Sequence, residues 1–87
     1  MAVPTDQEIL NRINTVVEDI LKKKPEDLSL DSKFIEDLGA DSLDTVSLLM
    51  ALDQEFDEEI SDKEAKGLTT IGDTLSFIKQ KIAAGAV

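Results

Sequence analysis

The central helix of the chain begins within the stretch Leu38-Gly39-Ala40-Asp41-Ser42-Leu43-Asp44-Thr45-Val46. Aspartate is among the preferred N-cap residues, so Asp41 predicts a helix from about Ser42 to Phe56. Gly39 supplies backbone freedom for the turn into that helix. Ser42 then stands in the first turn, where free N–H groups and the helix dipole favour an attached anion such as a phosphate.

The predicted central helix carries two apolar stripes at helical spacing. One stripe contains Leu48, Leu49, Leu52 and Phe56, together with the methyl group of Thr45. The second lies roughly opposite, beside Ser42, and contains Leu43, Val46 and Met50. One stripe must face the core of so small a domain. The second is either packed under the preceding loop or exposed as a docking surface, and its place beside a serine among carboxylates favours docking.

Three further helices are predicted from end signals and apolar spacing. Capping-box patterns at residues 5–8 and 61–64 open a first helix over about residues 6–23 and a short helix that Gly67 ends. The last helix starts near Thr70, and residues 24–40 form a long connection with scattered apolar anchors. No β alternation appears. The sequence therefore predicts an all-α fold: a small four-helix bundle of three main helices and one short helix, with a long loop between the first and second, in a single domain over residues 1–87.

The composition excludes several classes of function. The 87 residues contain no cysteine, and we expect neither a signal peptide nor a membrane-spanning run, hence no membrane insertion and a cytoplasmic location. The net charge of −10 resides in residues 36–64, where eleven carboxylates face one lysine. Such a segment repels nucleic acid and anionic membranes and attracts basic protein surfaces or cations.

The chemistry available around Ser42 favours attachment over catalysis. A serine nucleophile needs a base within hydrogen-bond reach, the chain has no histidine, and exposed carboxylates are too weakly basic to activate the hydroxyl unaided. We therefore expect no catalytic residues and no enzyme activity. Covalent modification of Ser42 by another protein is better supported, with Asp41 and Asp44 placed to orient that protein. The simpler alternative is that Asp41 serves only as a helix cap.

A second acidic pattern resembles a calcium loop. Positions 1, 3, 5, 7, 9 and 12 of an EF-hand fall on Asp53, Glu55, Asp57, Glu59, Ser61 and Glu64. The glycine required at position 6 is replaced by Glu58, and no partner loop follows. We therefore predict no dedicated metal site, although loose binding of divalent cations to this cluster is plausible.

A longer match identifies a family. The segment Lys33-Phe34-Ile35-Glu36-Asp37-Leu38-Gly39-Ala40-Asp41-Ser42-Leu43-Asp44-Thr45-Val46 closely resembles the acyl carrier proteins of dissociated (type II) fatty acid synthesis. The similarity continues through Leu48-Leu49-Met50-Ala51-Leu52, Glu55-Phe56-Asp57, Glu59-Ile60-Ser61-Asp62 and Thr69-Thr70. It covers nearly the whole chain.

The resemblance implies specific roles for named residues. Ser42 would receive 4′-phosphopantetheine from coenzyme A through a phosphopantetheinyl transferase, and the thiol of that arm would carry acyl groups as thioesters. A docking surface for the basic faces of fatty acid synthesis enzymes would comprise Asp37, Asp41, Leu43, Asp44, Val46, Met50 and Asp53. The acyl chain would be sheltered by Leu52, Ile60, Ala65 and Leu68. We expect such a carrier to act as a monomer.

The chain departs from the family pattern at four positions. Ser47, Gln54 and Lys66 stand where acidic residues are common, and Ser61 stands where proline is usual. Three docking charges are thus altered. Two other interpretations stay open: a specialised acyl carrier for a polyketide or lipid-modification pathway, and an acidic, cation-linked protein-binding module in which Ser42 is only part of a cap.

Overall fold

The computed structural model describes residues 5–85, apart from the side chains of residues 62, 84 and 85. It contains four α-helices, α1 (Asp6–Leu21), α2 (Ser42–Phe56), α3 (Asp62–Ala65) and α4 (Ile71–Gly85), and one 3₁₀ turn, η1 (Pro25–Asp27). Within the described residues the extended pairing is limited to an isolated antiparallel bridge between Lys33 and Thr70. The predicted all-α four-helix bundle, with three main helices and one short helix, is confirmed.

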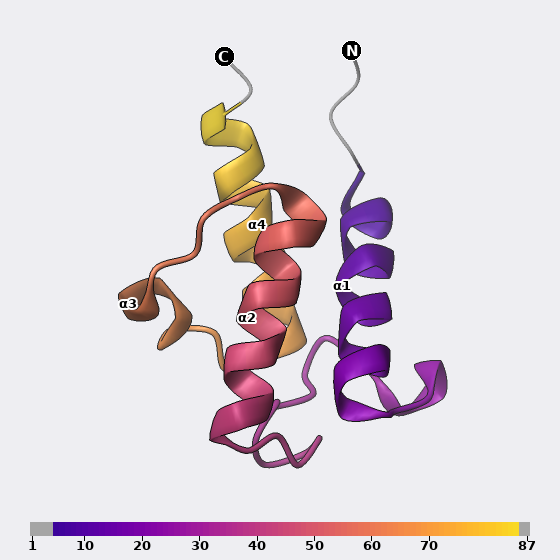
Figure 1. Ribbon diagram of the computed structural model, residues 1–87. Helices are drawn as coiled ribbons and strands as arrows, with labels where there is room; N and C mark the ends of the chain where they lie inside the picture. Colours follow the sequence, from indigo (N-terminus) through magenta and orange to yellow (C-terminus); the bar gives the residue numbers. More distant parts are fainter. Residues whose placement is uncertain (1–4, 86–87) are drawn as a thin grey trace.

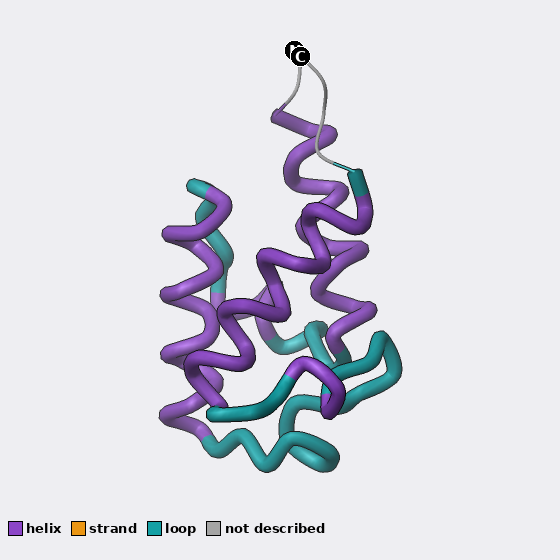
Figure 2. Tube along the Cα trace, turned by 90° about the vertical axis from the view of Figure 1, so that its right-hand side faces the viewer, coloured by secondary structure: helices purple, strands orange, loops and turns teal. Residues whose placement is uncertain are grey.

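The three main helices run alongside one another, and α1 is antiparallel to both α2 and α4 (Figure 1). Helix α1 packs against each of these two helices. The short helix α3 lies on the side of α2 away from α1 (Figure 1). The long loop between α1 and α2 crosses the end of the bundle at which α2 begins (Figure 2). The first turn of α2 therefore lies beside that loop rather than inside the bundle.

The helix ends follow the predicted caps with one correction. Thr5 accepts a hydrogen bond from the Glu8 N–H and so caps α1, as the capping-box pattern predicts. The prediction that this helix extends to about residue 23 was wrong, because α1 ends at Leu21. Lys22 adopts the left-handed conformation with φ of 58°, and its N–H bonds to the Glu18 carbonyl.

The core is aliphatic and lies where the three main helices meet. Ile13, Val17, Ile71 and Ile78 are fully buried, and each buried side chain of this size contributes about 1.5–3 kcal/mol of hydrophobic free energy. The other buried apolar residues are Ile9, Phe34, Leu38, Ala40, Leu48, Leu52 and Ile60. Phe34, Leu38 and Ala40 belong to the long loop, so part of this loop docks onto the core as expected, whereas its apolar residues Leu30 and Ile35 are exposed.

Backbone hydrogen bonds tie the long loop to the start of α4. The Phe34 N–H donates to the Thr69 carbonyl at 3.0 Å, and the Gly72 N–H donates to the Leu30 carbonyl at 2.9 Å. A Cβ atom at Gly72 would stand 3.0 Å from the Leu30 carbonyl oxygen and would push that carbonyl away, so the close approach favours glycine. Within the loop, the Ala40 N–H donates to the Phe34 carbonyl at 2.8 Å. These bonds fix the residues that lead into Asp41.

Candidate functional site

Ser42 is exposed and occupies the first position of α2, as predicted. Its neighbours form a reciprocal cap: the Asp44 N–H donates to Asp41 Oδ1 at 2.8 Å, and the Asp41 N–H donates to Asp44 Oδ2 at 3.2 Å. Among the described residues, the N–H groups of Ser42 and Leu43 have no acceptor. An anion attached to the Ser42 hydroxyl would therefore meet free donors and the positive end of the helix dipole.

The apolar stripe beside Ser42 faces solvent. Leu43, Val46 and Met50 are 77%, 54% and 59% exposed, whereas Leu48 and Leu52 on the opposite stripe are buried. Of the two alternatives for this stripe, packing under the loop is thus wrong and exposure is observed. Ile35 of the long loop is also exposed, at 67%. Apolar side chains gathered on one exposed face are characteristic of a docking surface.

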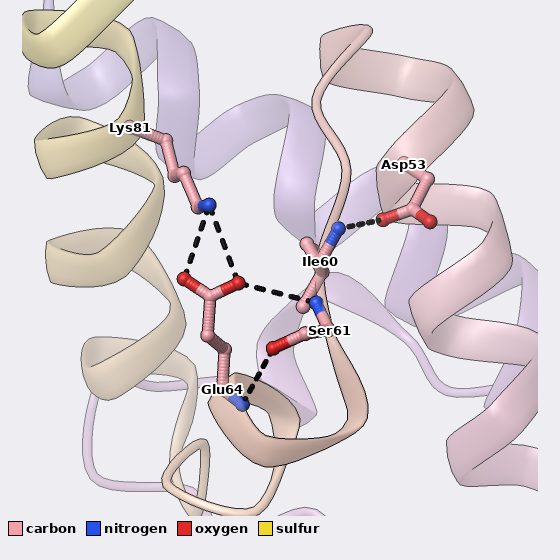
Figure 3. A network of polar contacts seen from close by, with 5 residues as sticks. All are labelled: Asp53, Ile60, Ser61, Glu64 and Lys81. Carbon is pink, nitrogen blue, oxygen red and sulfur yellow. Dashed lines mark hydrogen bonds and ion pairs between the residues drawn. The ribbon is translucent and has the colours of Figure 1, made fainter.

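The four predicted docking acids differ in what else they do. Asp41 and Asp44 flank Ser42 and cap α2. Asp37 lies in the long loop, where its carboxylate accepts the Lys33 N–H at 2.8 Å. Asp53 lies near the other end of α2 and accepts the Ile60 N–H at 3.1 Å (Figure 3). The structure therefore brings only Asp41 and Asp44 next to the serine. The carboxylates of Asp37 and Asp53 instead accept backbone N–H groups of other residues.

An apolar pocket of about 300 Å³ opens between α2, α3, the start of α4 and the long loop. Three of the four residues predicted for an acyl cavity, Leu52, Ala65 and Leu68, line it. Ile60 does not: it is buried in the core, where its N–H is bonded to Asp53. The remaining lining residues were not predicted, and they are Lys33, Phe34, Ile35, Glu36, Thr45, Leu48, Leu49, Lys66, Thr69 and Thr74.

Part of this pocket was detectable from the sequence. Leu48 and Leu49 lie on the same predicted stripe as Leu52, so helical spacing puts all three side chains on one side of α2. The loop residues, such as Phe34, gave no such signal, because irregular spacing does not show which wall a loop residue reaches. Thr74 is fully buried and donates to the Thr70 carbonyl at 3.2 Å, as a hydroxyl on an inward helix face often does.

The short helix α3 is held by a polar network (Figure 3). Ser61 accepts the Glu64 N–H, and Glu64 in turn accepts the Ser61 N–H at 3.2 Å, which confirms the predicted capping box. Lys81 of α4 reaches both Glu64 oxygens, at 3.3 and 3.0 Å. The Ser61 N–H, and then the Lys81 ammonium, lower the pKa of Glu64. The network anchors the wall that contributes Ala65 to the pocket.

The acidic cluster after α2 does not have the shape of a calcium loop. Helix α2 continues through Phe56, so the first four positions of the EF-hand pattern are helical. In the part of the chain that the structure describes, no three acidic side chains are placed to hold one metal ion. No helix among the described residues is long and apolar enough to cross a bilayer.

Comparisons with known proteins agree with this geometry. Residues 11–78 match a protein family described as the phosphopantetheine attachment site. The acyl carrier protein of Thermosynechococcus vestitus is 49% identical over 77 residues, which cover 88% of this chain and 95% of the relative. The acyl carrier protein of Prochlorococcus marinus is 46% identical over 77 residues, which cover 88% and 96%. The chain therefore belongs to the phosphopantetheine attachment family, among the acyl carrier proteins.

Proposed function

We propose that Ser42 is the residue that carries 4′-phosphopantetheine, and that the chain transports acyl intermediates of fatty acid biosynthesis on this arm. The observation that carries the proposal is the position of Ser42, exposed in the first turn of α2 between two capping carboxylates and beside an exposed apolar stripe. When bound, the arm supplies a thiol that forms thioesters, which this cysteine-free chain otherwise lacks. The chain itself acts as a carrier and supplies no catalytic group.

The protein residues fit a phosphodiester at this position. The unpaired N–H groups of Ser42 and Leu43 are donors for its oxygens, and no described side chain accepts from or donates to the Ser42 hydroxyl. Asp41 and Asp44 keep the first turn wound through their reciprocal cap. The serine is thus held on a rigid element that faces solvent, where a transferase can reach it.

We propose that enzymes dock on the face formed by Leu43, Val46 and Met50 with Asp41 and Asp44. Basic residues on a partner would be attracted by the negative segment, which speeds encounter, and the apolar stripe would be covered once the surfaces meet. Asp37 and Asp53 contribute charge to the same segment while holding backbone N–H groups. The phosphopantetheinyl transferase and the fatty acid synthesis enzymes are the partners expected for this surface, acting on a monomeric carrier domain in the cytoplasm.

We further propose that the apolar pocket shelters the acyl chain. Leu52, Ala65 and Leu68 supply aliphatic surface, and the pocket is partly open to solvent. Each methylene moved from water into such a site gains about 0.8 kcal/mol. Sheltering therefore favours longer chains up to the size of the pocket and keeps the chain out of solvent between enzymes.

The test is the intact mass after incubation with coenzyme A, magnesium and a promiscuous phosphopantetheinyl transferase. We expect the wild-type chain to gain one phosphopantetheinyl group and Ser42→Ala to gain none. Ser47→Ala is the matched control, because Ser47 is an exposed serine on the same helix, and it should be modified like the wild type. Failure of the folded wild type to gain mass with this and with its native transferase would leave an acidic binding module as the leading interpretation.

A specialised pathway is the second candidate. Ser47 and Gln54 place neutral groups on α2 where acidic residues are common in type II carriers. Enzymes that read those charges would bind this chain less tightly than a standard carrier. The test compares the reaction rates of fatty acid synthesis enzymes with the wild type and with a Ser47→Glu, Gln54→Glu double variant. Unchanged rates favour the standard pathway over a specialised one.

A further inference from the structure

Two exposed lysines line the apolar pocket. Lys33 belongs to the long loop, and Lys66 is the residue that follows α3. The backbone bridge between Lys33 and Thr70, with the Phe34 N–H bonded to the Thr69 carbonyl, holds these two segments side by side. Both lysines are exposed, so each lies where the pocket meets solvent, which we call the rim.

The two lysines differ in what they already bind. Lys33 Nζ lies 3.1 Å from Glu36 Oε2, and this carboxylate raises the pKa of Lys33. Lys66 is exposed and makes no ion pair or hydrogen bond with a side chain that the structure describes. Of the two lysines, Lys66 is the candidate donor to a ligand.

The pocket lining restricts where a polar group of a bound chain can lie. The walls deeper in are Leu48, Leu49 and Leu52. An oxygen placed against them without a hydrogen-bond partner would lose its hydration without compensation, which is unfavourable. A chain attached through the Ser42 arm thus enters with its apolar end inward and leaves its thioester end, with any nearby oxygen, at the rim.

We propose that Lys66 makes this pocket selective for acyl chains that bear an oxygen close to the thioester, such as 3-hydroxyacyl chains, over saturated chains of the same length. The inference rests on the proposed function of Ser42 and names the substrate class of that site. The Lys66 ammonium donates to the chain oxygen at the rim. Thr45 and Thr69 also line the pocket and add hydroxyl groups to its lining.

The test compares two loaded forms of the protein. A phosphopantetheinyl transferase would load octanoyl and 3-hydroxyoctanoyl groups from their coenzyme A thioesters, and intact mass would verify each product. The readout is the rate of thioester cleavage by hydroxylamine, divided by the rate for the matching coenzyme A thioester, which removes the intrinsic reactivity of each chain. We expect the wild type to protect the thioester of the 3-hydroxyoctanoyl form about fivefold more than that of the octanoyl form. A factor of this size corresponds to one hydrogen bond to a charged donor that is weakened by solvent.

Three variants assign that preference to the rim donor. Lys66→Met should bring the ratio close to one by lowering protection of the 3-hydroxyoctanoyl form more than that of the octanoyl form, and Lys66→Arg should keep the preference. Lys63→Met removes the same charge from an exposed residue of α3 that does not line the pocket, and it should behave like the wild type. A wild-type ratio near one, or equal losses for both chains in Lys66→Met, overturns the selectivity with the carrier function intact. Absence of any mass gain on loading overturns the carrier function and this inference together.

Discussion

Replacing Asp41 separates the structural role of this carboxylate from its charge. Asp41→Ala removes the oxygen that accepts the Asp44 N–H at 2.8 Å, and loss of an N-cap of this kind costs about 1 kcal/mol. For a domain of this size, that corresponds to a fall in melting temperature of about 4–8 °C. Asp41→Asn removes the same negative charge but keeps a capping oxygen, and asparagine caps helices about as well as aspartate.

The comparison of the two variants isolates the cap, because both relieve the same repulsion within the acidic segment. We expect Asp41→Asn to melt at or slightly above the wild-type temperature and Asp41→Ala to melt below it by the amount given. Thermal unfolding followed by circular dichroism measures both melting temperatures. The rate at which a transferase modifies Ser42 should also be lower for Asp41→Ala, because the first turn of α2 frays in this variant. Equal melting temperatures for the two variants would refute the assignment of the Asp41 carboxylate as the cap of α2.

Three further predictions test charge in the rest of the chain. Asp44→Lys should lower the reaction rates of partner enzymes at low salt by about tenfold or more, because electrostatic steering is lost while the domain stays folded. Asp19→Lys makes the same charge change on α1 and should leave those rates near wild type. Added salt or divalent cations should raise the melting temperature by screening the acidic segment, and a constant melting temperature over a wide salt range would contradict this account. The pKa of Glu64 is lowered in the folded state, so the ionised carboxylate stabilises the fold above the unfolded pKa of 4.5. This contribution is lost as the pH falls through the folded pKa. The melting temperatures of the wild type and Glu64→Gln should therefore differ at neutral pH and converge in acid.

The parts of the fold that were predictable from the sequence are those set by local interactions. The start of α2 depends on two residues three apart, Asp41 and Asp44, whose caps are readable without knowing the rest of the structure. The same holds for Ser61 and Glu64 at α3. The end of α1 was misplaced because Lys22 takes the left-handed conformation, which most side chains disfavour and the sequence pattern does not mark.

The pocket was only partly predictable because its walls come from segments far apart in the chain. Ile60 was expected to line it, yet its backbone is bonded to Asp53 and its side chain belongs to the core. Lys33 lines the pocket from a loop segment that pairs with Thr70, far away in the chain. Neither contact has a local sequence signature. Family resemblance could name the cavity residues, but only the packing of loop against helix shows which side chains reach it.

The cap formed by the carboxylates at the serine is compatible, for a physical reason, with the docking role proposed for them. An ionised carboxylate has two oxygens with about four acceptor positions, and the cap uses Asp41 Oδ1 for the Asp44 N–H and Asp44 Oδ2 for the Asp41 N–H. The other oxygen of each side chain makes no hydrogen bond with a described group, so a partner lysine or arginine can bind there without breaking the cap. Docking then leaves the first turn of α2 wound and Ser42 fixed. In the proposed docking, a partner that recognises these charges would be brought to a serine whose position the same carboxylates fix.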